Sequence, residues 1–492
     1  DKTGGNASFV VSAGDQIHTT KKKSPGKSEM TSEIEYTGYL SPDVLKSLPV
    51  ATTVGNHDAD NANYTYHFNT PNSSDLGSNG VVGGDYYFTY GNTLFMMLNT
   101  QDTNAAEHKQ FMEQAIAANP NCTWRVVTLH QDIYGSAEHS NEPEITNLRY
   151  TLVPYFEAND VDVVLTGHDH AYSRTHILEG GHKTVEYTDD EFDAKLDKDM
   201  DAGENPATRY EAPANISADS KEPADVAYLN YLNAVMDKDA IEDTEKGETV
   251  VNPDGILYMT ANSSSGSKYY DLVPRMQSYI ANRWQEDVPT YSVIDVTDNT
   301  FTINTYRTDN DQKIDETFTI KKGVTEDIKS ASVGNVKNQI YTGKQIQPAI
   351  KVTLNGKTLK AGKDYTVTYT DNKNTGLAKA TINGIGKYTG TQTVTFKIVP
   401  KKAVLKTVKA GKSGTATVTI GKAGGKVSGY AIQVSTDSSF KKVTTYRTAK
   451  TTYTLKNLSK GKTYYVRVKA FTKVSDKNVY GAASKTIKVK AK

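Results

Sequence analysis

Cysteine and tryptophan are scarce in this chain of 492 residues, which holds one cysteine and two tryptophans. The single thiol, Cys122, excludes an internal disulfide and a thiolate metal cluster. That scarcity fits a cytosolic protein, and equally a secreted protein that is stabilised without disulfides. Runs of about 18 apolar residues are also missing, so we expect no transmembrane helix.

The chain begins with Asp1 and reaches an apolar, strand-like run at residues 9–11. This abrupt start predicts a fragment or a processed product, so the lack of a signal peptide here does not indicate the compartment. A chain of this length exceeds what one hydrophobic core usually serves, so we expect several domains.

The net charge of zero is the sum of a strongly acidic N-terminal part and a strongly basic C-terminal part. Residues 331–492 hold 32 Lys and Arg but 4 Asp and Glu, a net charge of +28, whereas residues 1–330 hold the remaining 25 and 53, a net charge of −28. The basic part is expected to contact a polyanion such as an anionic cell-wall polymer. Alternatively, its lysines keep exposed strand faces soluble and discourage edge pairing. It lacks clustered arginine with interleaved aromatics, so we expect no nucleic-acid partner.

Residues 8–175 alternate between short apolar runs and amphipathic stretches. The runs end in glycine or polar residues and predict strands, whereas a 3.6-residue apolar spacing at 105–118 and 144–158 predicts helices. This alternation predicts an α/β sheet with helices on its faces. Strand patterns resume after residue 254 and predict a second sheet that closes the same domain near Lys322.

An acidic segment at about 177–253 interrupts this pattern and is poor in large apolar side chains. It predicts a long surface insertion that is partly disordered or forms a lid over a site.

The C-terminal part has the alternating pattern and Asn/Gly turns of β-sandwiches, and we predict modules at 323–400 and 401–492. The first resembles an immunoglobulin-like repeat of secreted Gram-positive bacterial proteins. In the second, the segment 458–464, LSKGKTY, resembles the tyrosine corner of a fibronectin type III domain, although the early tryptophan of such domains is missing. Neither module shows a cluster of ionisable residues suited to catalysis.

Metal-type ligands stand at the ends of four predicted strands, where open α/β sheets gather their sites. The motifs are Gly14-Asp15, Gly55-Asn56-His57-Asp58, Leu129-His130 and Gly167-His168-Asp169-His170. Each is weak alone, since a Gly-Asp after a strand is usually a turn. Their order resembles that of the calcineurin-like metallophosphoesterases, and GHDHAYSRTH is similar to the GHxHxYER segment of the purple acid phosphatase branch.

The resemblance covers about residues 8–322 and implies a metallophosphoesterase domain over 1–322, in which helices flank two mixed β-sheets. It implies that Asp15 bridges two metal ions, that Asn56, His130 and His168 complete one of them, and that His170 binds the other. Imidazole and amide ligands favour first-row ions such as Fe, Zn or Mn over calcium.

The same resemblance implies the catalytic groups. His57 falls on the family's catalytic imidazole, with Asp58 holding its tautomer, and His139 lies nine residues after His130, where plant-type members keep a substrate-facing histidine. The implied reaction is in-line attack on a phosphoester by a metal-bound hydroxide, with His57 assisting. As an alternative, His139 is a solvated loop residue.

Two positions depart from the family. Its members carry a ligand Asp on a strand some 25 to 40 residues before the Gly-Asp motif, and no such strand precedes Asp15 here, so we expect this fragment to bind the first metal poorly. Purple members place a tyrosine three residues after the bridging Asp, and here that residue is His18. His18 is either a metal ligand or a loop imidazole that faces solvent.

The sequence therefore predicts a secreted or cell-surface metal-dependent phosphoric ester hydrolase that acts on small phosphomonoesters, with the β modules as spacers or wall-binding appendages. Two alternatives remain open. One is a phosphodiesterase or nucleotidase of the same fold, and the other is a non-catalytic surface protein with a degenerate phosphatase domain.

Overall fold

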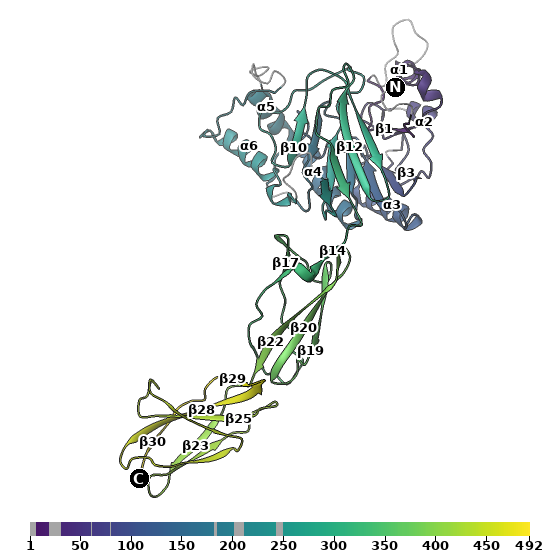
Figure 1. Ribbon diagram of the computed structural model, residues 1–492. Helices are drawn as coiled ribbons and strands as arrows, with labels where there is room; N and C mark the ends of the chain where they lie inside the picture. Colours follow the sequence, from purple (N-terminus) through teal and green to yellow (C-terminus); the bar gives the residue numbers. More distant parts are fainter. Residues whose placement is uncertain are drawn as a thin grey trace. The chain divides into compact units, whose positions relative to one another are not determined.

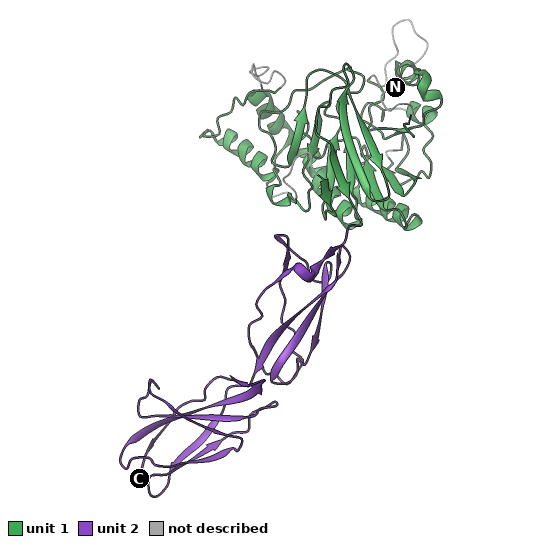
Figure 2. Ribbon diagram, in the orientation of Figure 1, with its two compact units in different colours: residues 1–323 green, residues 324–492 purple. Residues whose placement is uncertain are grey.

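The computed structural model describes residues 6–18, 31–60, 62–78, 80–181, 185–200, 211–242 and 249–492. The chain divides into two compact units, residues 1–323 and 324–492 (Figure 2). Unit 1 is a mixed α/β structure and unit 2 is built of strands, as the fold prediction required (Figure 1). No helix within the described ranges is both long and apolar enough to cross a membrane.

A seven-stranded mixed sheet forms the centre of unit 1, in the order β10-β7-β9-β6-β5-β4-β3. Strands β4, β5, β6 and β9 run parallel, and the flanking pairs are antiparallel. The strands are β3 (Tyr86–Tyr90), β4 (Thr93–Met97), β5 (Trp124–Thr128), β6 (Val163–Thr166), β7 (Tyr172–Thr175), β9 (Leu257–Thr260) and β10 (Ile280–Trp284). The parallel strands are almost entirely buried because both faces of the sheet are covered, which explains their continuous apolar runs.

Helices α3 (Ala105–Ala118) and α4 (Pro143–Ala158) contribute to the core on one face of this sheet, where Met112 and Leu152 pack with Met96 of β4. A second sheet covers the other face, where Phe301 packs with Trp124. Its order is β11-β12-β13-β8. Its strands are β8 (Thr249–Val251), β11 (Thr290–Val296), β12 (Thr300–Arg307) and β13 (Phe318–Lys321).

The N-terminal part of unit 1 adds a two-stranded parallel sheet, β1-β2, and three short helical elements. These are β1 (Val10–Ser12), β2 (Val50–Thr52), α1 (Thr31–Tyr39), η1 (Asp43–Lys46) and α2 (Asn63–His67). A small core of its own, with Tyr36 and Tyr64 fully buried, holds these elements together.

The described part of the acidic segment forms helices α5 (Asp189–Met200) and α6 (Pro223–Ala234) and the turn η2 (Lys238–Ala240), and the expectation that the insertion is partly disordered stays a prediction. Its few apolar residues are spaced to meet: Phe192 packs against Tyr228 and Tyr231 in a separate core. Residues 182–184, 201–210 and 243–248 of the segment lie outside the described residues, and its role as a lid stays a prediction.

Unit 2 contains two strand-built cores, one within residues 328–398 and the other within 403–491. Around the first lie β14 (Glu326–Asp327), η3 (Ile328–Ser330), β15 (Ser332–Val333), β16 (Gln339–Ile340), β17 (Val352–Leu354), β18 (Lys357–Thr358), β19 (Tyr365–Thr370), β20 (Gly376–Gly384), β21 (Tyr388–Thr389) and β22 (Thr391–Val399). Around the second lie β23 (Leu405–Ala410), β24 (Ala416–Ile420), β25 (Gly429–Ser435), β26 (Thr444–Thr448), β27 (Thr452–Leu455), β28 (Thr463–Val474), β29 (Lys477–Tyr480) and β30 (Ile487–Lys490). The Tyr464 hydroxyl accepts a hydrogen bond from the Ser459 N–H at 3.0 Å, the contact that the tyrosine-corner resemblance implies. The division into modules at 323–400 and 401–492 stays a prediction.

A buried ion pair joins the two sheets of unit 1. Asp315 accepts hydrogen bonds from Arg174 on β7, from Nε at 2.6 Å and from Nη2 at 3.1 Å. The Tyr172 hydroxyl and the Asn282 amide each donate to the same carboxylate at 2.7 Å. Burial alone would raise the pKa of Asp315, but the hydrogen bond and the charge of Arg174 outweigh it and lower that pKa.

The stability that Asp315 contributes is expected to be lost in acid. A carboxyl group with a lower pKa in the folded chain stabilises the fold above its unfolded pKa, and this contribution is lost as the pH falls through the folded pKa. The free energy of unfolding should therefore differ by about 3 kcal/mol between the wild type and Asp315→Asn near pH 7. The difference should shrink once the pH falls below the ordinary carboxyl pKa of 3.8.

Tryptophan fluorescence is a selective probe for this measurement, because the two tryptophans of the chain, Trp124 and Trp284, both lie in unit 1. Urea unfolding of the full chain, followed by this signal between pH 7 and pH 3, gives the difference at each pH. A difference that stayed constant or grew in acid would contradict the assigned role of Asp315.

Candidate metal centre

Strands β1, β2, β5 and β6 each end just before a predicted ligand motif. Hydrogen bonds between the segments bring these ends together, since the Gly167 N–H donates to the His130 carbonyl at 2.9 Å and the Thr53 N–H donates to the Ser12 carbonyl at 3.0 Å. Parallel strands present their carboxyl ends at one edge, so side chains that are distant in sequence meet there.

Three side chains converge on the Nε2 atom of His130, and with it they form a cluster of four. From this Nε2 atom, the Asn56 Oδ1 lies at 3.0 Å, the His168 Nδ1 at 3.1 Å and the Asp15 Oδ2 at 3.2 Å. The His130 Nδ1 donates to the Ala13 carbonyl at 2.8 Å, which leaves Nε2 as the ring atom that could bind a metal. Imidazole, amide and carboxylate acceptors that face one another in this way fit a first-row metal cation.

The protonation states of Asp15 and His168 suit a metal. For His130, burial would lower the pKa, but the charge of Asp15 outweighs it and raises that pKa, so a bound metal would have to displace a proton from Nε2. Burial would raise the pKa of Asp15, but the neighbouring His130 outweighs it and holds that pKa well below its usual value, so the carboxylate is ionised. Burial and then the charge of His130 hold the pKa of His168 well below its usual value, so its imidazole is neutral. Metal ligands must be in these deprotonated forms.

The backbone is shaped to bring the ligands close. A Cβ atom on Gly14, whose φ is +96°, would lie 2.4 Å from the Nδ1 of His130, and one on Gly55 would lie 2.1 Å from the Oδ1 of Asp15. Asp15 and His168 themselves have φ values of 51° and 68°, in the left-handed region that non-glycine residues rarely adopt. Such local strain concentrates at functional sites.

His170 lies outside the cluster of four. Its Nδ1 donates to the Lys268 carbonyl at 3.0 Å, which leaves Nε2 as the atom that could bind a metal. Its φ is 49°, so the backbone of the GHDH segment is unusual at both histidines. The assignment of His170 to a second ion stays a prediction.

His57 lies beside the cluster and is positioned through its backbone. Its N–H donates to the Asp15 Oδ1 at 2.9 Å, and its ring centroid lies 5.0 Å from that of His18. His18 is exposed and its N–H donates to Glu35 at 2.8 Å. Whether His18 binds a metal stays a prediction.

The expectation that Asp58 holds the tautomer of His57 is wrong for the described residues, because its side chain points inward. Asp58 is 1% exposed and accepts hydrogen bonds from the Tyr36 hydroxyl at 2.8 Å and the Gly55 N–H at 3.0 Å. Burial, and then the charge of Asp15, raise its pKa to about 7. Asp58 therefore fixes the turn that carries His57, and it does not contact the imidazole.

The structure places His139 against the cluster, with its ring centroid 4.9 Å from that of His168. Its Nδ1 lies 2.5 Å from the Glu142 Oε1, and its N–H donates to the Asp169 Oδ1 at 2.9 Å. Burial would lower the pKa of His139, but the hydrogen bond to Glu142 and the charge of Asp169 outweigh it and raise that pKa to about 10. His139 is therefore a cation beside the candidate metal ligands.

Comparison with known families agrees with this geometry. Residues 2–172 match the family model described as calcineurin-like phosphoesterase. The N-terminal domain is a calcineurin-like metallophosphoesterase. Residues 405–486 match the model of the fibronectin type III domain, so the chain ends in such a domain.

Individual relatives are distant. The metallophosphoesterase domain is 26% identical over 173 residues to an uncharacterized protein of Mycobacterium tuberculosis, a match covering 30% of this chain and 32% of that protein. It is 27% identical over 178 residues to the serine/threonine-protein phosphatase CPPED1 of Pongo abelii, covering 33% of this chain and 53% of that one. The matches thus span about a third to a half of these relatives. Among solved structures, the purple acid phosphatase PPD1 of yellow lupin shows 14% identity and a TM-score of 0.34, covering 65% of this chain and 55% of that chain.

Sequence reasoning missed how the metallophosphoesterase domain anchors His139. Asp169, between the two histidines of GHDH, faces inward and accepts hydrogen bonds from the Ala137 N–H at 2.6 Å and the Ser140 hydroxyl at 2.5 Å. His168 and His170 both have a positive φ, so the segment is not an extended strand and no alternation of side chains predicts this contact.

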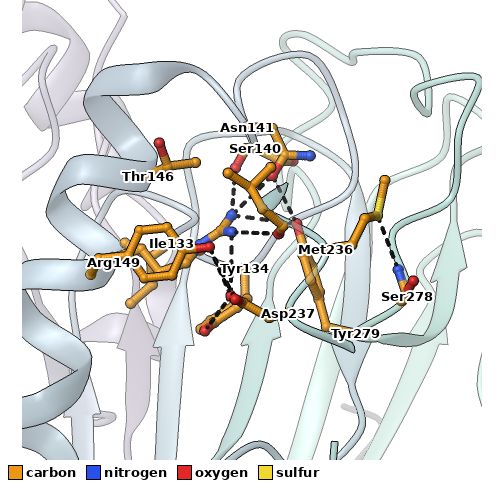
Figure 3. Close-up of polar contacts among 12 residues, drawn as sticks. Ile133, Tyr134, Ser140, Asn141, Thr146, Arg149, Met236, Asp237, Ser278 and Tyr279 are labelled. Atoms are coloured by element: carbon orange, nitrogen blue, oxygen red, sulfur yellow. Dashed lines mark hydrogen bonds and ion pairs between the residues drawn. The ribbon is translucent and has the colours of Figure 1, made fainter. Parts of the chain in front are cut away.

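A second missed feature is the fully buried Arg149 of α4 (Figure 3). Its guanidinium donates to the carbonyls of Ile133, Ser140 and Val235, and it lies 3.8 Å from the Asp237 carboxylate. It thereby joins three parts of unit 1: α4, the loop that carries His139 and the segment that follows α6.

Proposed function

We propose that the metallophosphoesterase domain hydrolyses phosphomonoesters with the help of two first-row metal ions. The family match supports phosphoester hydrolysis in general. The observation that carries the proposal is the convergence of Asp15, Asn56 and His168 on His130, with the His57 backbone bonded to the same Asp15. Acceptors that face one another at about 3 Å are stable when a cation lies between them.

When bound, one ion would be held by Asn56, His130 and His168 and the other by His170, and Asp15 would be a ligand of both. Such a pair neutralises the phosphoryl oxygens and acidifies a water. Fe, Zn and Mn fit the donors, because imidazole and amide ligands suit these borderline ions better than calcium.

Two histidines beside the cluster would supply a proton and a positive charge to the reaction. Hydrolysis adds the oxygen of water to phosphorus and breaks the bond from phosphorus to the alcohol oxygen, which must gain a proton. His57 would donate that proton, and the support is the hydrogen bond from its backbone N–H to the Asp15 carboxylate beside the cluster. His139, held as a cation by Glu142, attracts the anionic ester.

The test is hydrolysis of p-nitrophenyl phosphate by the full chain after addition of Zn²⁺, Mn²⁺ or Fe²⁺. Wild-type chain should turn over the ester only when metal is present, and His57→Ala should lower kcat by roughly 10²–10⁴-fold. Zn²⁺ binding, measured calorimetrically, should survive in His57→Ala, because His57 is not among the proposed ligands.

Two outcomes would redirect the proposal. Wild-type activity no higher than that of His57→Ala at saturating metal would contradict the enzyme and favour a binding protein with a degenerate site. Faster turnover of bis(p-nitrophenyl) phosphate than of the monoester would instead favour the phosphodiesterase alternative.

We further propose that the protein works outside the cell or on its surface and that its basic C-terminal part contacts an anionic wall polymer. The support is the net charge of +28 on residues 331–492. Retention of the full chain on immobilised teichoic acid should fall as salt rises. Failure to be retained at low salt would contradict this role.

A further inference from the structure

The loop that connects β9 to β10 lies against the candidate metal centre. Its Lys268 carbonyl accepts the hydrogen bond from the His170 Nδ1, and Gln285 donates both to the His170 carbonyl at 2.7 Å and to the Tyr270 carbonyl at 3.2 Å. A β-bridge between Leu272 and Ala137 fixes the end of the loop next to the segment that carries His139. The loop is thus attached to the site on two sides.

Tyr270 reaches from this loop to both histidines at the edge of the site. Its ring centroid lies 4.9 Å from that of His139, in an edge-on arrangement with an interplanar angle of 89°, and 5.1 Å from that of His170. Tyr270 therefore joins the GHDH segment to the loop that carries His139.

Lys268 places an ammonium group over the same tyrosine. Its Nζ lies 4.1 Å from the centroid of the Tyr270 ring and contacts the Tyr270 hydroxyl. Lys268 is exposed to solvent. The face of an aromatic ring attracts a cation, so the contact holds an otherwise flexible side chain at the rim of the site.

Among the residues that the structure describes, Lys268 forms no ion pair with a carboxylate. Burial raises the pKa of Glu138, and the charge of Lys268 is among the effects that oppose this rise, so the ammonium acts on Glu138 only at longer range. Residues 1–330 have a net charge of −28, so an exposed ammonium beside the site supplies a local positive charge in an otherwise acidic part of the chain. A second anionic group on a bound ester would meet it.

We propose that Lys268 and Tyr270 form a second anion-binding subsite, which selects phosphoesters whose organic group carries a carboxylate or a second phosphate. The inference rests on the proposed function, because the scissile phosphate must bind at the metal cluster. The aromatic ring packs against the organic group, and the ammonium pairs with its distal charge.

The test is calorimetric binding of aryl phosphonates, which cannot be hydrolysed, to the full chain in Zn²⁺. The nitro group of 4-nitrophenylphosphonate and the carboxylate of 4-carboxyphenylphosphonate have nearly the same shape and differ in charge, and 1,4-phenylenediphosphonate offers a second phosphate-like group. The ratio of the neutral to the charged analogue's dissociation constant should fall roughly fivefold in Lys268→Gln. It should recover in Lys268→Arg, and it should not change in Lys46→Gln, an exposed lysine on η1.

The possible results distinguish a failure of the proposed subsite from a failure of the proposed function. An equal ratio in the wild type and Lys268→Gln for both charged analogues would overturn the subsite. A change for the carboxylate alone, or for the second phosphonate alone, would support the subsite and identify the group that it takes. Failure of all three analogues to bind the wild type in Zn²⁺ would contradict the proposed function and the subsite with it.

Discussion

Replacing His130 with alanine is expected to lower the affinity of the chain for Zn²⁺ by at least about a hundredfold and to abolish hydrolysis of p-nitrophenyl phosphate. Loss of a residue that only orients a ligand typically costs 10- to 100-fold in metal affinity, and the loss of a ligand costs at least the upper end of that range. The other three acceptors converge on His130. Its removal therefore also takes away the side chain that holds them at about 3 Å from a common atom.

The same substitution at another buried histidine provides the control. His176 is 9% exposed and follows β7 at the opposite end of that strand from the GHDH segment. His176→Ala should keep the wild-type affinity for Zn²⁺, as judged by calorimetry on samples with native tryptophan fluorescence. A His130→Ala chain that folds and binds Zn²⁺ as tightly as His176→Ala would contradict the assigned centre.

Replacing Arg149 with methionine is expected to lower the free energy of unfolding of unit 1 by about 3–5 kcal/mol. The guanidinium is fully buried and packs 4.4 Å from the Tyr134 ring. Its removal leaves the carbonyls of Ser140 and Val235 without this donor and takes away a cation that lies 3.8 Å from the buried Asp237 carboxylate. Unsatisfied buried acceptors carry their full desolvation cost.

Arg307→Met is the matched control for Arg149→Met, because Arg307 forms its ion pairs with Glu286 and Asp309, whose side chains are 45% and 46% exposed. Pairs of this kind contribute at most about 1 kcal/mol. Urea unfolding of the full chain, followed by tryptophan fluorescence, measures both variants in unit 1. Equal losses in the two variants would contradict the role of Arg149 as the junction of α4, the His139 loop and the segment after α6.

The strand-end motifs could be predicted from sequence because the signal is local. An apolar run followed by glycine and a polar residue marks the end of a strand, and the ends of parallel strands meet at one edge. This is how Asp15, Asn56, His130 and His168 could be expected together, and the structure brings these four side chains within contact distance.

Other features depend on contacts between distant residues, which no local pattern reports. The core under α5 and α6 rests on a few aromatic residues in a mostly acidic segment, so composition alone predicted a partly disordered insertion or a lid and did not predict this core. Asp58 follows His57 directly, and only the fold shows that its carboxylate turns away to Tyr36. Lys268 lies 98 residues from His170, and its place at the site depends on how the loop after β9 returns to the sheet.

The most direct test of the metal centre is anomalous X-ray scattering from crystals of the chain grown in saturating Mn²⁺ or Zn²⁺. We expect the anomalous map to show two ions about 3.5–4 Å apart. One should lie among Asn56, His130 and His168, the other should lie beside His170, and Asp15 should contact both. An anomalous map with no ion at the His130 cluster would contradict the central claim that these strand ends form a dimetal phosphoesterase site.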